Sequence, residues 1–241
     1  SYNKTSGMVT LNVREFSTFK VLAAVNTEET FKKAVTTAAP NDEIKVDANI
    51  TLTNTTPIDI DKNLTINLNG HTLSMTGTGN AMFKLTNNAT LTVKGGNVAN
   101  SKLEVRSAAG AAAYIANIES GKLVLGDQAP VTNMATFTAS APATGAGAAL
   151  SVTVLCAKTS FDPSAYVGNP YVAQGNAADG WTVDEYAAKL TKVTASGVLG
   201  GGTVTTYHKT LTDALLNVSS SSQIDEIELL RDIDLSAAGE T

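Results

Sequence analysis

The chain has 241 residues, of which 43% are apolar and only 16% are charged, and its net charge is −5. This acidic balance attracts no polyanion and argues against nucleic acid as a partner. Two His and one Cys are too few for a Cys/His metal site, and no run approaches the roughly 20 apolar residues of a membrane span. With so few charges, Thr, Asn, Ser, Ala and Gly must supply much of the surface.

Residues 1–25 contain two runs of alternating apolar and polar residues, at 8–13 and 17–22, which predict short strands. We interpret the segment as the end of an upstream module or as N-terminal strands of the module that follows. Residues 15–22 resemble the closing strand of immunoglobulin-like modules in Gram-positive surface proteins. No signal peptide or anchor is recognisable, and the start at Ser1 predicts that the chain is part of a longer protein.

Residues 27–39 predict the clearest helix. Asn26 or Thr27 can cap its N-terminus, and two glutamates follow in the first turn, where the helix dipole favours negative charge. Phe31 marks its apolar face, and Pro40 ends it. A helix just before stacked coils predicts a cap, because the first coil would otherwise expose an apolar end and open strand edges.

Residues 41–125 consist of short triplets in which apolar and polar residues alternate, separated by Asn-, Gly- and Thr-rich turns. Alternation indicates one buried and one wet face, and strands this short suit a coil that turns a corner every few residues and stacks on itself. The pattern predicts a mainly β chain folded as a right-handed parallel β-helix, with coils of about 20 to 25 residues. The side chains predicted to point inward are Ile44, Ile66, Leu68, Leu91 and Val93.

Residues 129–149, rich in Ala, Thr, Gly and Pro, predict either a loop that bulges from the coil or a set of irregular rungs. A clear strand is expected again at 149–155. Cys156 follows in the same apolar run, and we interpret it as a small buried hydrophobe.

Aromatic residues gather between 161 and 186, among them Tyr166, Tyr171 and Trp181. They can form a platform on which sugar rings stack, or they can pack over the last coil as a C-terminal cover. We favour the cover, because large aromatic side chains more often fill a core. Gly200–Gly202 predicts a hinge or turn, since the Lys-Ser/Thr of a phosphate loop does not follow.

The end of the chain repeats its beginning. Residues 210–216 match 30–36 with an offset of 180, and residues 225–235 match 42–52 with an offset of 183. Such a period is far too long for one coil, so it predicts a second module of the same kind that starts at 207. Burying each apolar side chain of residues 207–241 is worth roughly 1.5–3 kcal/mol, so the segment should pack on the end of the coils, on the region 166–181 or on a neighbouring chain. We expect it to be ordered and to act as a C-terminal cover, helix first.

These segments resemble a known family. Residues 207–215, followed by 225–233, are similar to the opening of pectin-lyase-like β-helix modules that repeat in large bacterial surface proteins of Gram-positive type. Residues 64–73 resemble the next piece of those modules, and residues 161–183 resemble their closing segment. The resemblance covers residues 27–235. Its motifs are structural, so it implies a right-handed β-helix and a cell-surface origin but no reaction.

The residues that chemistry on this fold would need are sparse. Asp59 and Asp61 lie two apart and would share one face of a strand, where they could bind calcium or act as acid and base. We interpret them as solvated, because Ile58 and Ile60 take the inward positions. His71 follows an Asn-Gly turn without an evident partner, and the arginines are scattered at Arg14, Arg106 and Arg231. The sequence therefore predicts no catalytic, cofactor-binding or metal-binding residues.

Six asparagines fall in Asn-X-Ser/Thr triplets, as expected by chance in an Asn- and Thr-rich chain. We expect no glycosylation if the source is bacterial, and inward asparagines at the corners of coils could instead form hydrogen-bonded ladders. The six are Asn3, Asn49, Asn54, Asn63, Asn88 and Asn217.

We therefore expect a non-enzymatic extracellular or cell-surface module of a multidomain bacterial protein, acting as an adhesin or rigid stalk. Its parts would be residues 1–25, a β-helix module at 26–206 and the truncated start of a second module at 207–241. The expected partners are neighbouring modules and host or microbial glycans or surface proteins, with no nucleic acid and no membrane insertion. The alternatives are a carbohydrate-binding or polysaccharide-cleaving β-helix and a phage fibre or spike module.

Overall fold

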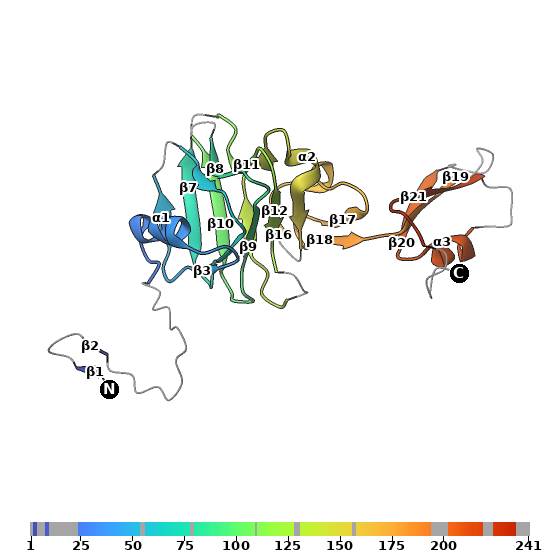
Figure 1. The fold of residues 1–241 in the computed structure, drawn as a ribbon. Coiled ribbons are helices and arrows are strands. Elements are labelled where there is room, and N and C mark those ends of the chain that lie inside the picture. The colour runs from blue at the N-terminus through green and yellow to red at the C-terminus, as the bar shows by residue number, and fades with distance from the viewer. Residues whose placement is uncertain are drawn as a thin grey trace.

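The chain is mainly β, and its central part is a solenoid of stacked parallel sheets with a short helix at the N-terminal end (Figure 1). A hairpin follows the solenoid, and a small antiparallel sheet with one helix follows the hairpin. The computed structural model describes residues 2–3, 8–9, 24–53, 56–77, 80–108, 110–127, 131–155, 158–193, 202–218 and 224–234. Most of the predicted N-terminal runs at 8–13 and 17–22, together with Arg14, Cys156 and Gly200–Gly201, lie outside these residues. Of the first run, Met8–Val9 is β2 and pairs with β1 (Tyr2–Asn3).

Each coil of the solenoid adds one strand to each of three parallel sheets. The first sheet has the order β15-β12-β9-β6-β3, the second β16-β13-β10-β7-β4, and the third β14-β11-β8-β5. The strands of the first sheet are β3 (Glu43–Lys45), β6 (Leu64–Asn67), β9 (Thr90–Lys94), β12 (Lys122–Leu125) and β15 (Val152–Val154). Those of the second are β4 (Ile50–Leu52), β7 (Thr72–Gly77), β10 (Lys102–Ser107), β13 (Thr136–Thr138) and β16 (Lys158–Thr159). Those of the third are β5 (Ile58–Ile60), β8 (Ala81–Leu85), β11 (Tyr114–Ile118) and β14 (Ala141–Thr144).

The predicted inward positions are confirmed, and they stack in register from coil to coil. In the first sheet one column of apolar side chains runs through all five strands, and each member is at most 4% exposed. Because the register is parallel, every such side chain lies directly above its counterpart one coil earlier. The column consists of Ile44, Ile66, Val93, Leu125 and Val154.

The coils are less regular than predicted: they lengthen over the first three intervals and then shorten, since Leu123 pairs with Val152, which follows 152 − 123 = 29 residues later. Hydrogen bonds that join equivalent corners of successive coils link Asn41 to Asn63, Asn63 to Thr90 and Asn88 to Ser120. These partners are separated by 22, 27 and 32 residues, respectively. The inward columns keep their register through this growth because the extra residues lie in the corners between strands. Spacing measured between apolar residues that do not pair therefore underestimates the number of residues in a coil.

Asparagines at the corners join one coil to the next, but Asn41, Asn49 and Asn63 are exposed rather than inward as predicted. The Asn49 Oδ1 accepts a hydrogen bond from the backbone N–H of Thr72 at 2.8 Å, and the Asn63 Oδ1 accepts one from Thr90 at 2.8 Å. The Asn63 Nδ2 donates to the Asn41 Oδ1 at 3.3 Å. These bonds satisfy backbone groups where a corner interrupts the ladder of the sheet.

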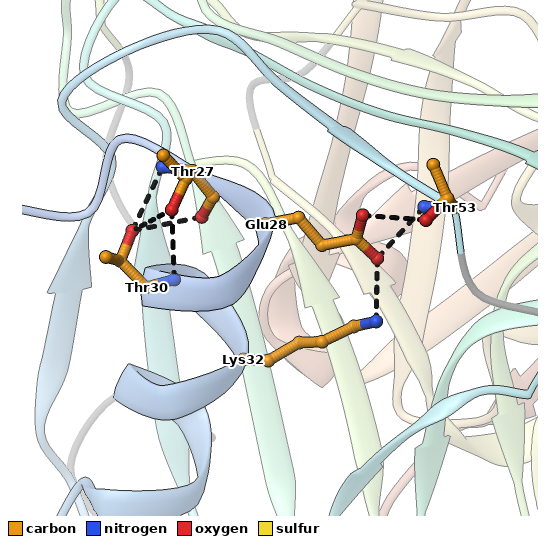
Figure 2. A network of polar contacts seen from close by, with 5 residues as sticks. All are labelled: Thr27, Glu28, Thr30, Lys32 and Thr53. Carbon is orange, nitrogen blue, oxygen red and sulfur yellow. Dashed lines mark hydrogen bonds and ion pairs between the residues drawn. The ribbon is translucent and has the colours of Figure 1, made fainter.

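The predicted N-terminal helix is α1 (Glu28–Thr37), and Thr27 is its N-cap. Figure 2 shows that Thr27 and Thr30 bond each other's backbone in a capping box, at 3.2 and 3.0 Å. The Glu28 carboxylate accepts hydrogen bonds from the backbone N–H and the hydroxyl of Thr53, at 3.1 and 2.8 Å. Lys32 Nζ lies 2.6 Å from the same carboxylate. The first turn of α1 is thereby joined to the residue that follows β4.

The segment at 129–149 forms irregular rungs rather than a loop, because β13 and β14 both lie within it and pair with the preceding coil. The expected strand at 149–155 is only half correct. It begins inside α2 (Ala148–Ser151), and β15 starts at Val152. Leu150 is 81% exposed on that helical turn. The apolar character of Leu150 therefore indicates neither a strand nor a core position.

A hairpin covers the C-terminal end of the coils. Its strands are β17 (Tyr171–Asn176) and β18 (Gly180–Glu185), preceded by the short helix η1 (Ser164–Tyr166), and β18 packs against β15 and β16. Trp181 and Val183 of β18 are buried in the solenoid core. The expectation that residues 207–241 cover this end is wrong for the described parts, 207–218 and 224–234, because the preceding hairpin occupies it, and residues 219–223 and 235–241 lie outside the described residues.

Removing one member of an inward stack should destabilise the solenoid strongly. Leu91 is fully buried between its partners on two neighbouring coils. Leu91→Ala should lower the free energy of unfolding by about 2–5 kcal/mol, because the rigid coils cannot collapse into the space. Urea titration monitored by circular dichroism measures the change. Thr92→Ala, at the adjacent outward position, is the matched control and should cost less than about 1 kcal/mol.

The contact between Glu28 and Thr53 should stabilise the chain only while the carboxylate is charged. The hydrogen bond from Lys32, followed by those from Thr53, lowers the pKa of Glu28 below its usual range. Its contribution is therefore full above the unfolded pKa of about 4.3 and is lost as the pH falls through the lower folded value. Glu28→Gln should lower the free energy of unfolding at pH 7 by roughly 0.5–1.5 kcal/mol. Glu29→Gln controls for the helix dipole, and an equal loss in both variants would contradict the role of Thr53.

Candidate functional site at the C-terminal junction

The structure does not gather the residues that were weighed for chemistry. Asp59 is an exposed outward residue of β5, and Asp61 follows the strand and lies 3.7 Å from Lys62. His71 is a turn residue whose backbone N–H donates to Leu68. Arg106 pairs with Glu104 at 2.9 Å on the outside of β10. Among the described residues, no group of three or more His, Cys, Asp or Glu side chains could hold a metal ion.

The aromatic residues at 161–186 serve different roles. Trp181 is only 9% exposed and belongs to the core, as the cover interpretation predicted, and Tyr166 packs partly against that core. Tyr171 is exposed, and Lys122 Nζ lies 5.2 Å from the centre of its ring. The three rings therefore form no shared platform. Within the described part of the chain, no helix is long and apolar enough to cross a membrane.

The most distinctive arrangement lies beyond the hairpin, where three strands form an antiparallel sheet in the order β20-β19-β21. These strands are β19 (Ala188–Val193), β20 (Thr203–His208) and β21 (Ile224–Leu229), and α3 (Leu211–Leu216) packs against β19 and β20. We call this sheet and helix the C-terminal unit. Its buried side chains are Ala187, Ala188, Leu190, Ala214 and Leu230. The sheet crosses the predicted module boundary at 206/207, since β19 precedes it, β20 spans it and β21 follows it.

The C-terminal unit repeats the N-terminal cap with one constant offset of 183 in residue number. Thr27 caps α1, and Thr210 caps α3 by accepting a hydrogen bond from Asp213 N–H at 3.0 Å. The fully buried Phe31 then corresponds to the fully buried Ala214. The offset of 180 proposed for the helices, which pairs Ala34 with Ala214, is therefore wrong. Identical residue types favoured the wrong alignment of the two helices. The N-cap residues and the buried helical positions give the correct one.

In the C-terminal unit, one strand lies between two positions whose counterparts in the N-terminal cap are hydrogen-bonded directly to each other. There, the Asp47 N–H donates to the Val25 carbonyl at 2.9 Å. The corresponding residues are Leu230 and His208, and Ala187 lies between them. The Leu230 N–H donates to the Ala187 carbonyl at 2.9 Å, and the Ala187 N–H donates to the His208 carbonyl at 2.9 Å. A strand that continues from the first module is thus inserted into the start of the second helix–strand unit.

Charged side chains surround this insertion. Lys209 Nζ donates to the Glu185 carbonyl at 3.0 Å, lies 3.4 Å from an Asp184 carboxylate oxygen and sits 4.2 Å from the centre of the Tyr186 ring. Arg231 Nε lies 3.6 Å from the Glu185 carboxylate. Partial burial, and then the nearby Asp184 charge, raise the pKa of Tyr186. These groups hold the two residues between β18 and β19 from both sides.

Sequence reasoning missed the role of β19. Residues 188–191 alternate apolar and polar, which is a signal for a strand, but the pairing partners lie on the far side of the glycine-rich segment. Nothing local indicates that the strand belongs with the repeat rather than with the solenoid. Comparisons with protein-family models, curated proteins and solved structures found no match.

Backbone bonding at Ala187 should matter more to the junction than the surrounding charges. Ala187→Pro removes the N–H that donates to His208 and adds bulk at a fully buried position. The unmade hydrogen bond alone should cost roughly 1–3 kcal/mol. Lys209→Ala should cost less than about 1 kcal/mol, because its side chain is half exposed and exposed ion pairs contribute little.

Hydrogen exchange of the amides in β19 and β21 measures both effects. Ala187→Pro should accelerate exchange in the two strands, while the amides of β6 and β9 serve as an internal control and stay protected. Unchanged protection of β19 in Ala187→Pro would contradict the insertion of this strand.

Proposed function

We propose that this chain is a non-enzymatic structural module that acts as a rigid stalk in a multidomain extracellular protein. The observation that carries the proposal is the junction. β18 ends at Glu185 and β19 begins at Ala188, so only two residues connect the cover of the solenoid to the next sheet. A connection this short, bonded on both sides through Ala187, leaves little freedom between the solenoid and the C-terminal unit.

Stiffness, rather than reach, is the property that the fold supplies. Five strands spaced by about 4.8 Å give the solenoid an axis of roughly 20 Å for about 120 residues. A flexible Gly/Ser chain of about that length would have ends roughly 60 Å apart on average. The solenoid therefore gives up length for a fixed direction and broad flanks. That trade suits a stalk that must hold neighbouring modules in a defined orientation.

The resemblance to pectin-lyase-like modules of bacterial surface proteins supports the same proposal and an extracellular or cell-surface location. An adhesin is the second candidate, because the outward face of the second sheet carries polar side chains in register at Thr51, Ser74 and Glu104. A polysaccharide-cleaving module would need carboxylates brought together near a base. Asp59 and Asp61 have such spacing near β5, and the Glu104 carboxylate of β10 lies 2.6 Å from Lys102 and 2.9 Å from Arg106.

A distance measurement across the junction tests the stalk. Spin labels at the exposed positions Thr51 and Thr205, with Cys156 replaced by Ala, should give one narrow distance distribution by pulsed electron resonance. The distribution should be the same at about 50 mM and 1 M salt, because exposed ion pairs are screened whereas backbone bonds are not. Ala187→Pro should broaden it, while Lys209→Ala should leave it narrow.

Two further outcomes would redirect the proposal. A broad distribution in the parent chain would exclude a rigid stalk. Retention of the chain on a glycan array would favour an adhesin instead, and release of unsaturated uronides from polygalacturonate that is lost in Asp59→Ala or Asp61→Ala would favour an enzyme.

A further inference from the structure

β21 is an edge strand of the sheet in the part of the chain that the structure describes. Its inner edge bonds β19, and the Leu230 N–H that follows the strand also points to that side. Because backbone groups alternate in direction along a strand, Ile227 and Leu229 direct their N–H and carbonyl groups to the outer edge. No described strand pairs with that edge.

The same positions in the N-terminal cap show what such an edge binds. Under the offset of 183, Ile227 and Leu229 correspond to Ile44 and Val46. Val46 donates its N–H to the Asn67 carbonyl of β6 at 2.9 Å, and Ile44 lies in register with Ile66 of β6. The edge of β3 that carries the second coil thus corresponds, residue by residue, to the outer edge of β21.

The exposure of the side chains distinguishes β21 from β3. Ile44 and Val46 are 4% and 0% exposed beneath the second coil, whereas Leu229 is 51% exposed and Ile227 is half-buried. Beside Leu229 lies an open hollow of about 530 Å³. It is lined by Leu211, Leu229, Leu230, Arg231, Asp232 and Ile233.

The hollow extends past β21, and this indicates a coil rather than a single strand as its occupant. Ile233 corresponds to Ile50 of β4, which is 3% exposed because Leu73 of β7 stacks on it. A strand added to β21 alone would leave Ile233 partly exposed. A coil covers both β21 and Ile233, since its first strand pairs with β21 and its second strand lies over residues 231–233.

The outward face adds a polar requirement. In the N-terminal cap, the Glu43 carboxylate accepts a hydrogen bond from Asn67 Nδ2 at 2.7 Å and lies 2.7 Å from Lys94 Nζ. Glu226 takes the place of Glu43 and is exposed. The strand that pairs with β21 should therefore carry an amide outward next to apolar inward residues, as β6 does.

We propose that the outer edge of β21 and the adjoining hollow are the docking surface for a further solenoid coil of the same kind as residues 56–77, supplied in tandem on the same polypeptide. The inference rests on the proposed stalk function and specifies how successive modules join. β19 links the first module to the next sheet, and β21 provides the edge on which the next solenoid begins.

A tandem chimera tests this docking. Residues 1–235 are followed by residues 53–193 of the same chain, which continues the offset of 183. The amides of Ile227 and Leu229 should exchange about 100-fold more slowly in the chimera than in the parent chain, because they become bonded within a sheet. As the matched control, Ile66→Asp with Leu68→Asp in the added segment should restore the parent rates.

Each other outcome would overturn the proposal. Added coils that fold without slowing the exchange of Ile227 would show that they do not dock on β21. Failure of the added segment to fold would count equally against it, because the same segment folds on β3 in the parent. Concentration-dependent protection in the parent, with a doubled mass by sedimentation, would assign the edge to a second copy. The spin-label distances of the parent report on the stalk independently of all these results.

Discussion

The structure depends on parallel, in-register stacking of apolar side chains from coil to coil. Each coil buries its inward column only when another coil lies above and below it, and each strand satisfies its backbone only through the same neighbours. In the column from Ile44 to Val154, every side chain is therefore covered on both sides except the two at the ends. Both ends need a different element, and the chain supplies α1 at one and the hairpin β17–β18 with Trp181 at the other.

The junction beyond the hairpin combines two kinds of interaction of unequal strength. The ion pairs of Lys209 and Arg231 are exposed and screened, so they orient the connection more than they stabilise it. The hydrogen bonds of Ala187 are made at a fully buried residue between two other strands, and leaving them unmade is costly. Here the strand β19 follows the hairpin after two residues and pairs with β20 and β21 of the C-terminal unit. The exposed Leu229 then lies at the edge where a following coil would find its register.

Much of the solenoid could be predicted, because its signals are local. Alternation in triplets such as 64–66 and 91–93 identified the buried face, and the capping residue with its following glutamates identified the helix. The length of the coils could not be predicted, because corners absorb extra residues without disturbing the columns. Leu150 shows the limit of apolar pattern alone, since an apolar residue within a helical turn at the surface looks like part of a strand.

By itself, the sequence determined the parallel β-helix, the identity of its inward residues, the N-terminal cap and the existence of a second helix–strand unit, because periodicity, capping and internal repetition are properties of neighbouring residues. Only the tertiary structure decided which residues cover the end of the coils and that β19 enters the second unit. It also decided that the helices share the offset of 183 found for the strands. Those features depend on pairing between segments separated by loops, and a strand's own residues do not specify which of several compatible edges it will join.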